Sequence, residues 1–347
     1  MFAATHVTIK VGNVGDGGKR GLPKQQMVPV TILTGFLGAG KTTLLNHFLK
    51  GIDEQNVAVI INEFSDTSID SHLVVPTKEE IIEVNSGCIC CNVRADLINR
   101  LRNLNEREES LDRIVIETTG MANPAPVIQT FLMDKETAHS FEIDHVITMV
   151  DAKHIWQHLA EEEPGQQIAF ADVLLINKVD LITDDEKNKL GQRLTHMNPH
   201  AKQIYTTFAQ VDSRDVVGKK SFDLKNVVKI DPTLLTEMHH HHHNELVTSF
   251  VFQEDHPLDL EKVNNWFAYL VQCKGETLFR YKGVLYIKQL EKRVVFQGVH
   301  MLFASTEGAP WAKEEKRQSE IVFIGKHLDK QELAKGFHYC RASFFAT

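Results

Sequence analysis

Two short segments have the residue types and the spacing of a nucleotide site. The first reads Gly35-Phe36-Leu37-Gly38-Ala39-Gly40-Lys41-Thr42 and is followed by Thr43. Its glycines permit a turn whose backbone N–H groups cradle phosphates, Lys41 supplies a positive charge, and the Thr42 hydroxyl is a Mg²⁺ ligand. The segment follows a strand-like run and precedes an amphipathic helix, as this mechanism requires. It therefore predicts a phosphate-binding loop formed by Gly35, Gly38, Ala39, Gly40, Lys41, Thr42 and Thr43.

The second segment is Asn177-Lys178-Val179-Asp180, after the apolar run 173–176. A buried carboxylate at Asp180 can accept hydrogen bonds from N1–H and the exocyclic amine of guanine, and adenine lacks this pair of donors. Asn177 is expected to brace the loop, and the stem of Lys178 is expected to lie over the base. The predicted nucleotide is therefore GTP or GDP.

Acidic residues follow two further strand-like runs. Glu117 lies in Arg113-Ile114-Val115-Ile116-Glu117-Thr118-Thr119-Gly120, and Glu63 lies in Ile61-Asn62-Glu63-Phe64 with Asp66 just beyond. Glu117 can hold Mg²⁺ directly or through water, and the Gly120 N–H can contact the γ-phosphate. We expect Lys41, Glu117 and Glu63 to be catalytic and both loops to be nucleotide-dependent switches. No residue is identifiable as the base that positions water, so slow intrinsic hydrolysis is expected.

Three cysteines, Cys88, Cys90 and Cys91, fall within four positions between these two loops. Clustered thiols in a reducing compartment favour a thiophilic ion such as zinc, or alternatively a redox pair or buried structural thiols. Three thiolates leave a tetrahedral zinc shell incomplete, so Glu63, Asp66, a histidine, water or a client protein must complete it. Such a shell suits metal transfer. Cys273 and Cys340 are isolated and are expected to be core residues.

Histidines form a second candidate metal-binding segment. The run His239, His240, His241, His242 and His243 is interpreted either as a weak, multi-site metal collector or as a polar linker. His300 is expected to be an ordinary histidine within a strand.

The composition argues against two kinds of partner. A net charge of −8 over 347 residues argues against a nucleic acid or an anionic membrane held by bulk electrostatics. No apolar stretch approaches the roughly 20 residues needed to span a bilayer, and charges interrupt the N-terminus where a signal peptide would be apolar. A cytoplasmic protein is therefore expected.

The pattern of short apolar runs predicts the elements that position these residues. In the first part, strands and helices alternate as in a doubly wound, mostly parallel α/β domain. The expected strands are Val28–Thr34, Val57–Ile61, Arg113–Glu117, His145–Val150, Val173–Asn177 and Gln203–Thr206, with helices at Thr42–Lys50 and Glu186–Thr195. After the histidines, consecutive strands indicate a smaller α+β domain. Its expected strands are Leu246–Gln253, Leu278–Ile287, Arg293–Ala304 and Glu320–Gly325, with helices at Leu258–Gln272 and from Asp329.

The predicted domain organisation follows from these patterns. Residues 1–27 are glycine-rich and are expected to form a flexible tail, and residues 28–232 form the P-loop domain. Residues 233–245 are a His-rich linker, and residues 246–347 form the C-terminal domain.

Together these motifs resemble the CobW-type family of P-loop GTPases. The resemblance rests on residues 30–45, 62–64, 87–91, 117–126 and 177–180, and on Arg280-Tyr281-Lys282-Gly283, 296–299 and 321–325 in the C-terminal part. Two departures are visible: Asn62-Glu63-Phe64-Ser65-Asp66 has a shorter acid at its end than the family pattern, and Ile61 replaces an acid of the most similar subgroup.

The resemblance implies GTP hydrolysis with Mg²⁺, and zinc, cobalt, nickel or iron at Cys88, Cys90 and Cys91. It also implies that GTP couples metal binding to delivery into a metalloprotein client. Carried over by position, Lys41 and Thr42 serve phosphate and Mg²⁺, and Asn177 and Asp180 read guanine. Two other functions remain open: a metal-buffering protein with a structural nucleotide, and a small-molecule P-loop kinase.

Overall fold

The computed structural model describes residues 27–50, 56–63, 80–85, 92–106, 111–159, 161–212 and 247–342. These residues divide into two compact units, one before and one after the segment 213–246, and each is described by itself. The predicted tail and His-rich linker lie outside the described residues. The domain bounds 28–232 and 246–347 therefore stay a prediction.

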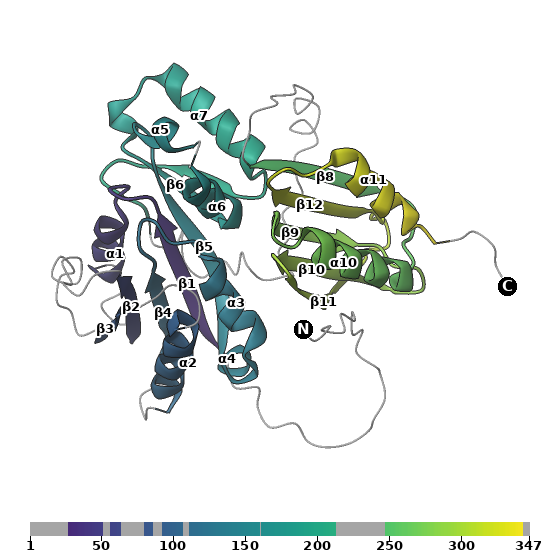
Figure 1. Ribbon diagram of the computed structural model, residues 1–347, viewed down its shortest axis with the longest axis horizontal. Coiled ribbons are helices and arrows are strands. Elements are labelled where there is room, and N and C mark those ends of the chain that lie inside the picture. Colours follow the sequence, from purple (N-terminus) through teal and green to yellow (C-terminus); the bar gives the residue numbers. More distant parts are fainter. Residues whose placement is uncertain are drawn as a thin grey trace. The chain divides into compact units, whose positions relative to one another are not determined.

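The first unit is a seven-stranded sheet in the order β3-β2-β4-β1-β5-β6-β7, and all of its strand pairs are parallel (Figure 1). This confirms the predicted doubly wound α/β class. Its strands are β1 Val28–Gly35, β2 Val57–Glu63, β3 Glu80–Asn85, β4 Arg113–Glu117, β5 Phe141–Asp151, β6 Val173–Asn177 and β7 Lys202–Tyr205. The edge strand β3 was not predicted, because acidic residues at 80 and 83 interrupt its short apolar run.

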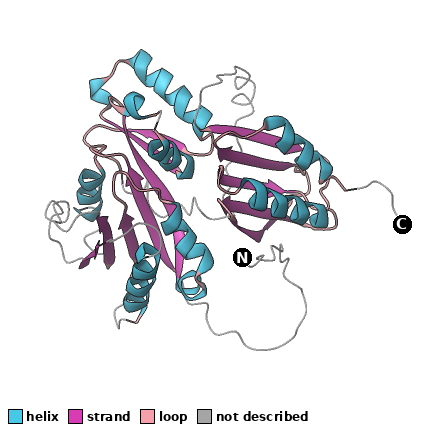
Figure 2. Ribbon diagram, viewed as in Figure 1, coloured by secondary structure: helices cyan, strands magenta, loops and turns pink. Residues whose placement is uncertain are grey.

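Helices cover both faces of the sheet (Figures 1 and 2). They are α1 Lys41–Lys50, α2 Asn92–Asn105, α3 Ala125–Met133, α4 Lys135–Ser140, α5 Ile155–His158, α6 Glu162–Phe170 and α7 Asp184–Met197. The apolar side of α1 packs on one face of the central strands through Leu44, Leu45 and Phe48. Because both faces are covered, the central strands are apolar throughout rather than alternating.

A buried ion pair fixes the amino ends of the central strands. Arg113 at the start of β4 donates to Asp144 of β5 at 2.7 Å and to the Thr31 hydroxyl of β1 at 2.9 Å. Asp144 lies at an irregularity in the pairing of β1 with β5. β5 begins at Phe141 and ends at Asp151, so it is longer than the predicted strand His145–Val150 at both ends.

The second unit is a five-stranded antiparallel sheet in the order β11-β10-β9-β12-β8, which confirms the α+β class. The strands are β8 Thr248–Glu254, β9 Leu278–Leu285, β10 Lys292–Val299, β11 Leu302–Pro310 and β12 Ser319–Gly325. The helices are α10 Leu260–Lys274 and α11 Lys330–Tyr339.

The predicted single strand Arg293–Ala304 is wrong, because the structure has a tight hairpin there. Val299 of β10 pairs with Leu302 of β11, which leaves His300 and Met301 as the turn. His300 adopts a left-handed backbone, with φ of 53°, and its Nδ1 lies 3.1 Å from the Gly275 carbonyl. Asn-Gly or Asp-Gly would have marked this turn, but His-Met has no such signature.

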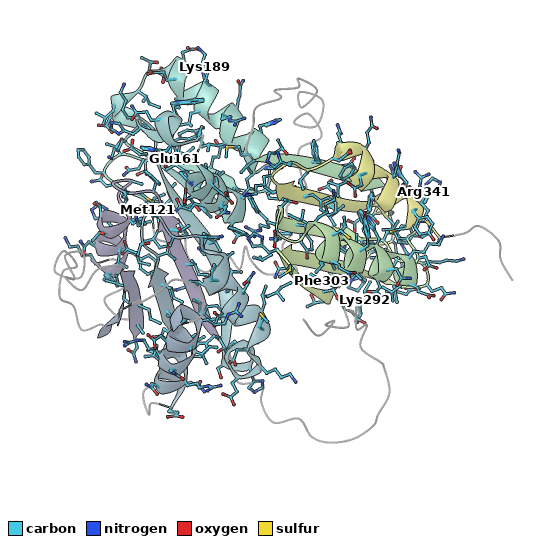
Figure 3. The ribbon with its side chains drawn as sticks, viewed as in Figure 1. Met121, Glu161, Lys189, Lys292, Phe303 and Arg341 are labelled. Atoms are coloured by element: carbon cyan, nitrogen blue, oxygen red, sulfur yellow. The ribbon has the colours of Figure 1, made fainter. Side chains whose placement is uncertain are left out.

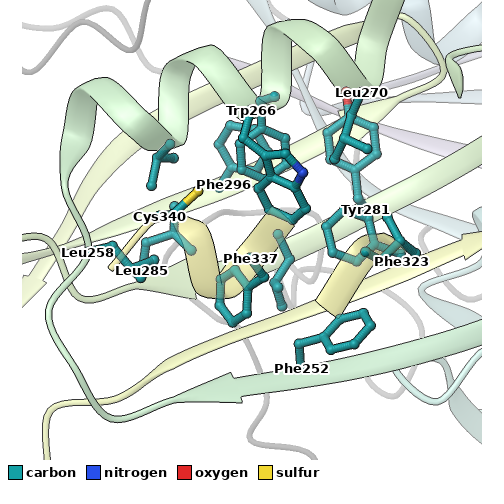
Figure 4. Packing of buried hydrophobic residues seen from close by; sticks show 14 of the residues in the cluster. Phe252, Leu258, Trp266, Leu270, Tyr281, Leu285, Phe296, Phe323, Phe337 and Cys340 are labelled. Carbon is teal, nitrogen blue, oxygen red and sulfur yellow. The ribbon is translucent and has the colours of Figure 1, made fainter. Parts of the chain in front are cut away.

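The core of the second unit is aromatic (Figure 4). The Trp266 ring of α10 lies 5.7 Å from Phe323 of β12 and 5.9 Å from Phe337 of α11, measured between ring centroids. Tyr281 of β9 covers Gly298 of β10, where an added Cβ would come within 2.0 Å of the tyrosine ring. Packing of this density leaves little space for substitution.

No helix of the described residues is long and apolar enough to cross a membrane.

Candidate functional site

Four neighbouring strands of the parallel sheet end in polar or glycine residues. In sheet order, Glu117 ends β4, Gly35 ends β1, Asp151 ends β5 and Asn177 ends β6. Parallel strands present their carboxyl ends at one edge, and ligands of open α/β sheets bind outside that edge. The structure thus brings the two predicted nucleotide segments together.

The phosphate loop connects β1 to α1. Gly35, Gly38 and Gly40 have φ values of 136°, 72° and 108°, which favour glycine. At Gly40 a Cβ would also lie 2.6 Å from the Asn177 side-chain nitrogen. The Lys41 ammonium donates to the carbonyls of Gly35 at 2.9 Å and Phe36 at 3.3 Å. The loop therefore folds around its own lysine. Thr42 and the exposed Thr43 lie in the first turn of α1.

Thr42 and Glu117 form a pair of oxygen donors beside this loop. The Thr42 hydroxyl donates to Glu117 Oε1 at 3.5 Å, and the Glu117 side chain is buried at the end of β4. Hydroxyl and carboxylate oxygens are ligands that Mg²⁺ prefers. The two side chains therefore have the oxygen donors that Mg²⁺ requires.

Asn177 connects the phosphate loop to the loop that follows β7. Its amide nitrogen donates to the Ala39 carbonyl at 2.9 Å, and its amide oxygen accepts from the Ala209 N–H at 2.9 Å. The side chain is buried, with 3% of its surface exposed. The structure thus gives Asn177 the bracing geometry expected from the sequence.

Lys178 and Asp151 form an ion pair that the sequence did not reveal. Lys178 has a left-handed backbone, with φ of 63°, and its ammonium donates to Asp151 Oδ2 at 2.7 Å. The same oxygen lies 3.0 Å from Nδ1 of His154. Burial raises the pKa of Asp151, but the hydrogen bonds from Lys178 and His154 outweigh it and hold that pKa below its usual value. Asp151 is therefore a carboxylate that orients Lys178.

Asp180 differs from expectation in one respect. The 3-10 turn Val179–Leu181 carries it beyond the sheet edge, and its side chain is exposed rather than buried. Asp180 can therefore reject adenine only if other groups cover the base and shield this carboxylate from water.

The loop after β7 supplies an exposed aromatic residue that sequence reasoning missed. Phe208 is 70% exposed, and Phe208 and Ala209 both have left-handed backbones, with φ of 52° and 54°. Such backbones are rare for non-glycine residues and concentrate at functional sites. The Thr206 hydroxyl donates to the Gln210 carbonyl at 2.6 Å, which holds the loop closed. The signal available in the sequence was an aromatic residue, Phe208, in the loop after a strand.

The segment after Glu117 is hydrogen bonded to residues that are distant in the sequence. Thr118 donates through its hydroxyl to Thr34 at 2.8 Å, and Gln167 of α6 donates to the carbonyls of Gly120 and Ala122, each at 3.2 Å. Gln167 was not predicted, because only the strand order brings α6 to this loop. Gly120 lies against Leu37 of the phosphate loop.

The predicted metal residues mostly lie outside the described part of the chain. They are Cys88, Cys90, Cys91, Asp66, His239, His240, His241, His242 and His243, together with the side chain of Glu63 at the end of β2. Among the described residues, no group of three or more His, Cys, Asp or Glu side chains is arranged to hold a metal ion.

The two isolated cysteines have different surroundings. Cys340 is buried as predicted, and burial raises its pKa to about 12. Cys273 is exposed, so its assignment to the core is wrong. It lies in the last turn of α10, beyond the buried residues Val263, Trp266, Phe267 and Leu270.

Comparisons with known proteins agree with this geometry. Residues 29–205 match the nucleotide-binding domain of CobW/HypB/UreG, and residues 247–341 match the CobW C-terminal domain. The zinc chaperone YjiA of Escherichia coli is 36% identical over 89% of this chain and 98% of its own length. The zinc-regulated GTPase metalloprotein activator 1 of Schizosaccharomyces pombe is 32% identical over 87% of this chain and 83% of its own length.

The solved structures include a similar protein. The crystal structure of zinc-bound YjiA GTPase from E. coli superimposes with a TM-score of 0.75 at 30% identity, over 92% of this chain and all of that one. The chain belongs to the CobW/HypB/UreG family of nucleotide-binding proteins and carries the CobW C-terminal domain.

Proposed function

We propose that this protein is a GTP-hydrolysing metallochaperone, which binds zinc and delivers it to a metalloprotein client in the cytoplasm. The observation that carries the proposal is the Asn177 side chain, which ties the phosphate loop to the loops expected at the base, with Thr42 and Glu117 alongside. The relatives named as a zinc chaperone and a zinc-regulated GTPase support the same function.

Phosphate binding falls to the backbone of the loop and to Lys41. On nucleotide binding, the Lys41 ammonium exchanges the carbonyls of Gly35 and Phe36 for phosphate oxygens. Thr42 and Glu117 would hold Mg²⁺, which would supply positive charge beside the phosphates. Glu63 is proposed as a further catalytic acid, and slow intrinsic hydrolysis is part of the proposal.

Guanine selection falls to Asp180, Lys178 and Phe208. The Asp180 carboxylate accepts from N1–H and the exocyclic amine, while the stem of Lys178 lies along one face of the base, its ammonium held by Asp151. Because Asp180 is exposed, the exposed ring of Phe208 is proposed to cover the base and keep water from these hydrogen bonds.

Base selection is tested by changing the hydrogen-bonding pattern of one side chain. Asp180→Asn presents a donor where guanine also has a donor, so we expect it to weaken GDP binding and to favour xanthosine diphosphate, whose extra carbonyl accepts. The exposed acid Asp184, in the first turn of α7, gives the matched control Asp184→Asn. Unchanged GDP affinity in Asp180→Asn would contradict the role of Asp180.

The metal half of the function is assigned to Cys88, Cys90 and Cys91, with the histidine run 239–243 collecting ions weakly. These cysteines lie in sequence between the two predicted switch loops, so contacts with the γ-phosphate can reshape their arrangement. Binding of zinc and of GTP is then coupled, and the coupling is reciprocal.

The coupling is tested by titrating zinc into the protein loaded with GDP or with a non-hydrolysable GTP analogue. Different zinc affinities in the two states are expected, and equal affinities would exclude coupling. Serine substitution of the three clustered cysteines should remove the tight site, whereas Cys273→Ser, at an exposed cysteine of the second unit, should not. Metal analysis of a client complex captured with the GTP-locked protein then identifies both ion and client.

A further inference from the structure

The short helix α5, beside the phosphate loop, is flanked and ended by two histidines. His154 directly precedes α5 and has helical dihedral angles (φ −105°, ψ −11°), and His158 is its last residue. Residues four apart on a helix lie on the same face. Both histidines line one cavity of about 230 Å³, together with Phe36, Gly38, Asp151 and Lys178.

Each histidine makes the same kind of hydrogen bond. Nδ1 of His154 lies 3.0 Å from a carboxylate oxygen of Asp151, and Nδ1 of His158 lies 2.8 Å from one of Glu161. Glu161 directly precedes α6 (Figure 3). A carboxylate oxygen accepts, so Nδ1 carries the proton in each ring. In the neutral imidazole this leaves a lone pair on Nε2.

A carboxylate behind the ring is the usual environment of a metal-binding histidine. It fixes the tautomer, orients the ring and makes the ligating nitrogen more basic. Two histidines that line one cavity, each with its own carboxylate, are therefore prepared to share one ion through their Nε2 atoms.

We propose that His154 and His158 form a second metal site, which binds one divalent ion of the imidazole-preferring class, such as Zn²⁺ or Ni²⁺. Imidazole suits these ions, whereas Mg²⁺ prefers oxygen ligands. No third His, Cys, Asp or Glu joins them among the residues that the structure describes, so water fills the remaining positions. Such a site binds exchangeable metal.

The charges around the cavity are balanced enough to admit a cation. Lys178 is positive, but its ammonium is 2.7 Å from Asp151 and is paired with it. Glu161 is negative, and Glu162 and Glu163 follow it in the first turn of α6.

The site adjoins both nucleotide segments. The ring of His158 packs on Phe36 of the phosphate loop, with centroids 4.3 Å apart. Asp151 holds both His154 and Lys178. An ion here would therefore contact the same framework that positions the nucleotide, separately from the cysteine cluster.

The test uses the full chain with the other proposed ligands removed, by changing Cys88, Cys90 and Cys91 to serine and His239–His243 to asparagine. Calorimetric titration with Zn²⁺ alone should give one ion per chain. His154→Ala and His158→Ala should each weaken binding at least tenfold, and Glu161→Gln, which removes no ligand, by about 10–100-fold. His139→Ala, at an exposed histidine of α4, is the control and should leave binding unchanged.

A second measurement needs no substitution at the site. Zinc should shift the Nε2 resonances of His154 and His158 in the ¹⁵N spectrum of the background protein much further than their Nδ1 resonances. The proposal is overturned if this protein binds no zinc, if both histidine variants bind as tightly as it does, or if other histidines shift instead.

Discussion

The two units of the chain use buried polar side chains in different ways. In the unit 27–212, Asn177 and Gln167 are buried and hydrogen bond to loop backbone at the sheet edge. In the unit 247–342, the buried carboxylate of Glu254 pairs with the side chains of His256, His338 and Arg341. At its sheet edge the first unit uses these two amides to shape loop backbone for a ligand, whereas the Glu254 cluster holds elements of the second unit together. Substitutions should therefore separate into those that change activity and those that change stability.

The largest expected effect is on the stability of the second unit. Phe337→Ala removes a ring that is 1% exposed and should lower the free energy of unfolding by about 3–5 kcal/mol, because it leaves a cavity in the aromatic core. Chemical denaturation measures this. Tyr339→Ala, on the same helix but 69% exposed, should cost less than about 0.5 kcal/mol. If folded Phe337→Ala also bound GDP more weakly, the division of activity and stability between the two units would be contradicted.

The largest effect on activity is expected at Lys41. Lys41→Met should lower single-turnover GTP hydrolysis by about 10²–10³-fold, because it removes a positioned charge from the developing phosphate negative charge. The free energy of unfolding should change little beside that of Phe337→Ala. Lys50→Met, at the exposed end of α1, is the control. Hydrolysis that persists in Lys41→Met would show that the loop is not the catalytic site.

The Glu254 cluster predicts a pH dependence that belongs to the second unit. Burial raises the pKa of Glu254, but hydrogen bonds from His256, Arg341 and His338 outweigh this and lower it from 4.5 to about 2. The folded pKa is below the unfolded one, so the stabilisation is fully present above about pH 4.5. It is lost as pH falls through about 2, and is on the order of 3 kcal/mol.

The measurement compares the wild type with Glu254→Gln across this range. The difference in unfolding free energy should shrink as pH falls from 4.5 toward 2. Glu314→Gln, at an exposed acid, should give no such trend. A constant difference would mean that the carboxylate charge is not what stabilises the cluster.

An intermediate effect is expected at Asn177. Asn177→Ala leaves the buried N–H of Ala209 and the Ala39 carbonyl without this partner, which costs about 1–3 kcal/mol of stability and should also weaken GDP binding. Asn177→Asp keeps the acceptor for Ala209 but loses the donor to Ala39, so it should retain part of the affinity. If Asn177→Ala lost stability alone, the bridge would resemble the polar groups of the second unit.

The smallest effect is expected at Phe208. Phe208→Ala should weaken GDP binding by up to about tenfold, since aromatic contacts contribute about 0.5–1.5 kcal/mol beyond burial. Stability should be unchanged, because the ring is 70% exposed. Phe208→Tyr should bind GDP as the wild type does. Equal affinity in Phe208→Ala would remove this ring from the proposed base site.

The sequence predicted the parts of this site whose signal is local. The glycines around Lys41 and the position of Asn177 at a strand end follow from short motifs, and the structure brings the two motifs together. Asp151 and Gln167 were missed because their importance depends on which strands and helices are neighbours. The exposure of Asp180 was missed because strand patterns do not show where a turn leaves the sheet.

The same limit explains the errors in the second unit. The residues from 293 to 304 read as one strand because His300-Met301 has no turn signature. The left-handed backbone of His300 and its contact with the Gly275 carbonyl appear only in the folded chain. Cys273 follows Leu270, the last buried residue of α10, and is exposed in the final turn of that helix.

The Asn177 bridge has a consequence for protein engineering and for evolution. Because one amide holds both the phosphate loop and the loop carrying Phe208, the two ends of the nucleotide site cannot be altered independently. A variant selected to bind another base must therefore keep this amide, because losing it would also weaken phosphate binding. New specificity should therefore arise first at Asp180 and Phe208, at the exposed rim, while Asn177 stays invariant.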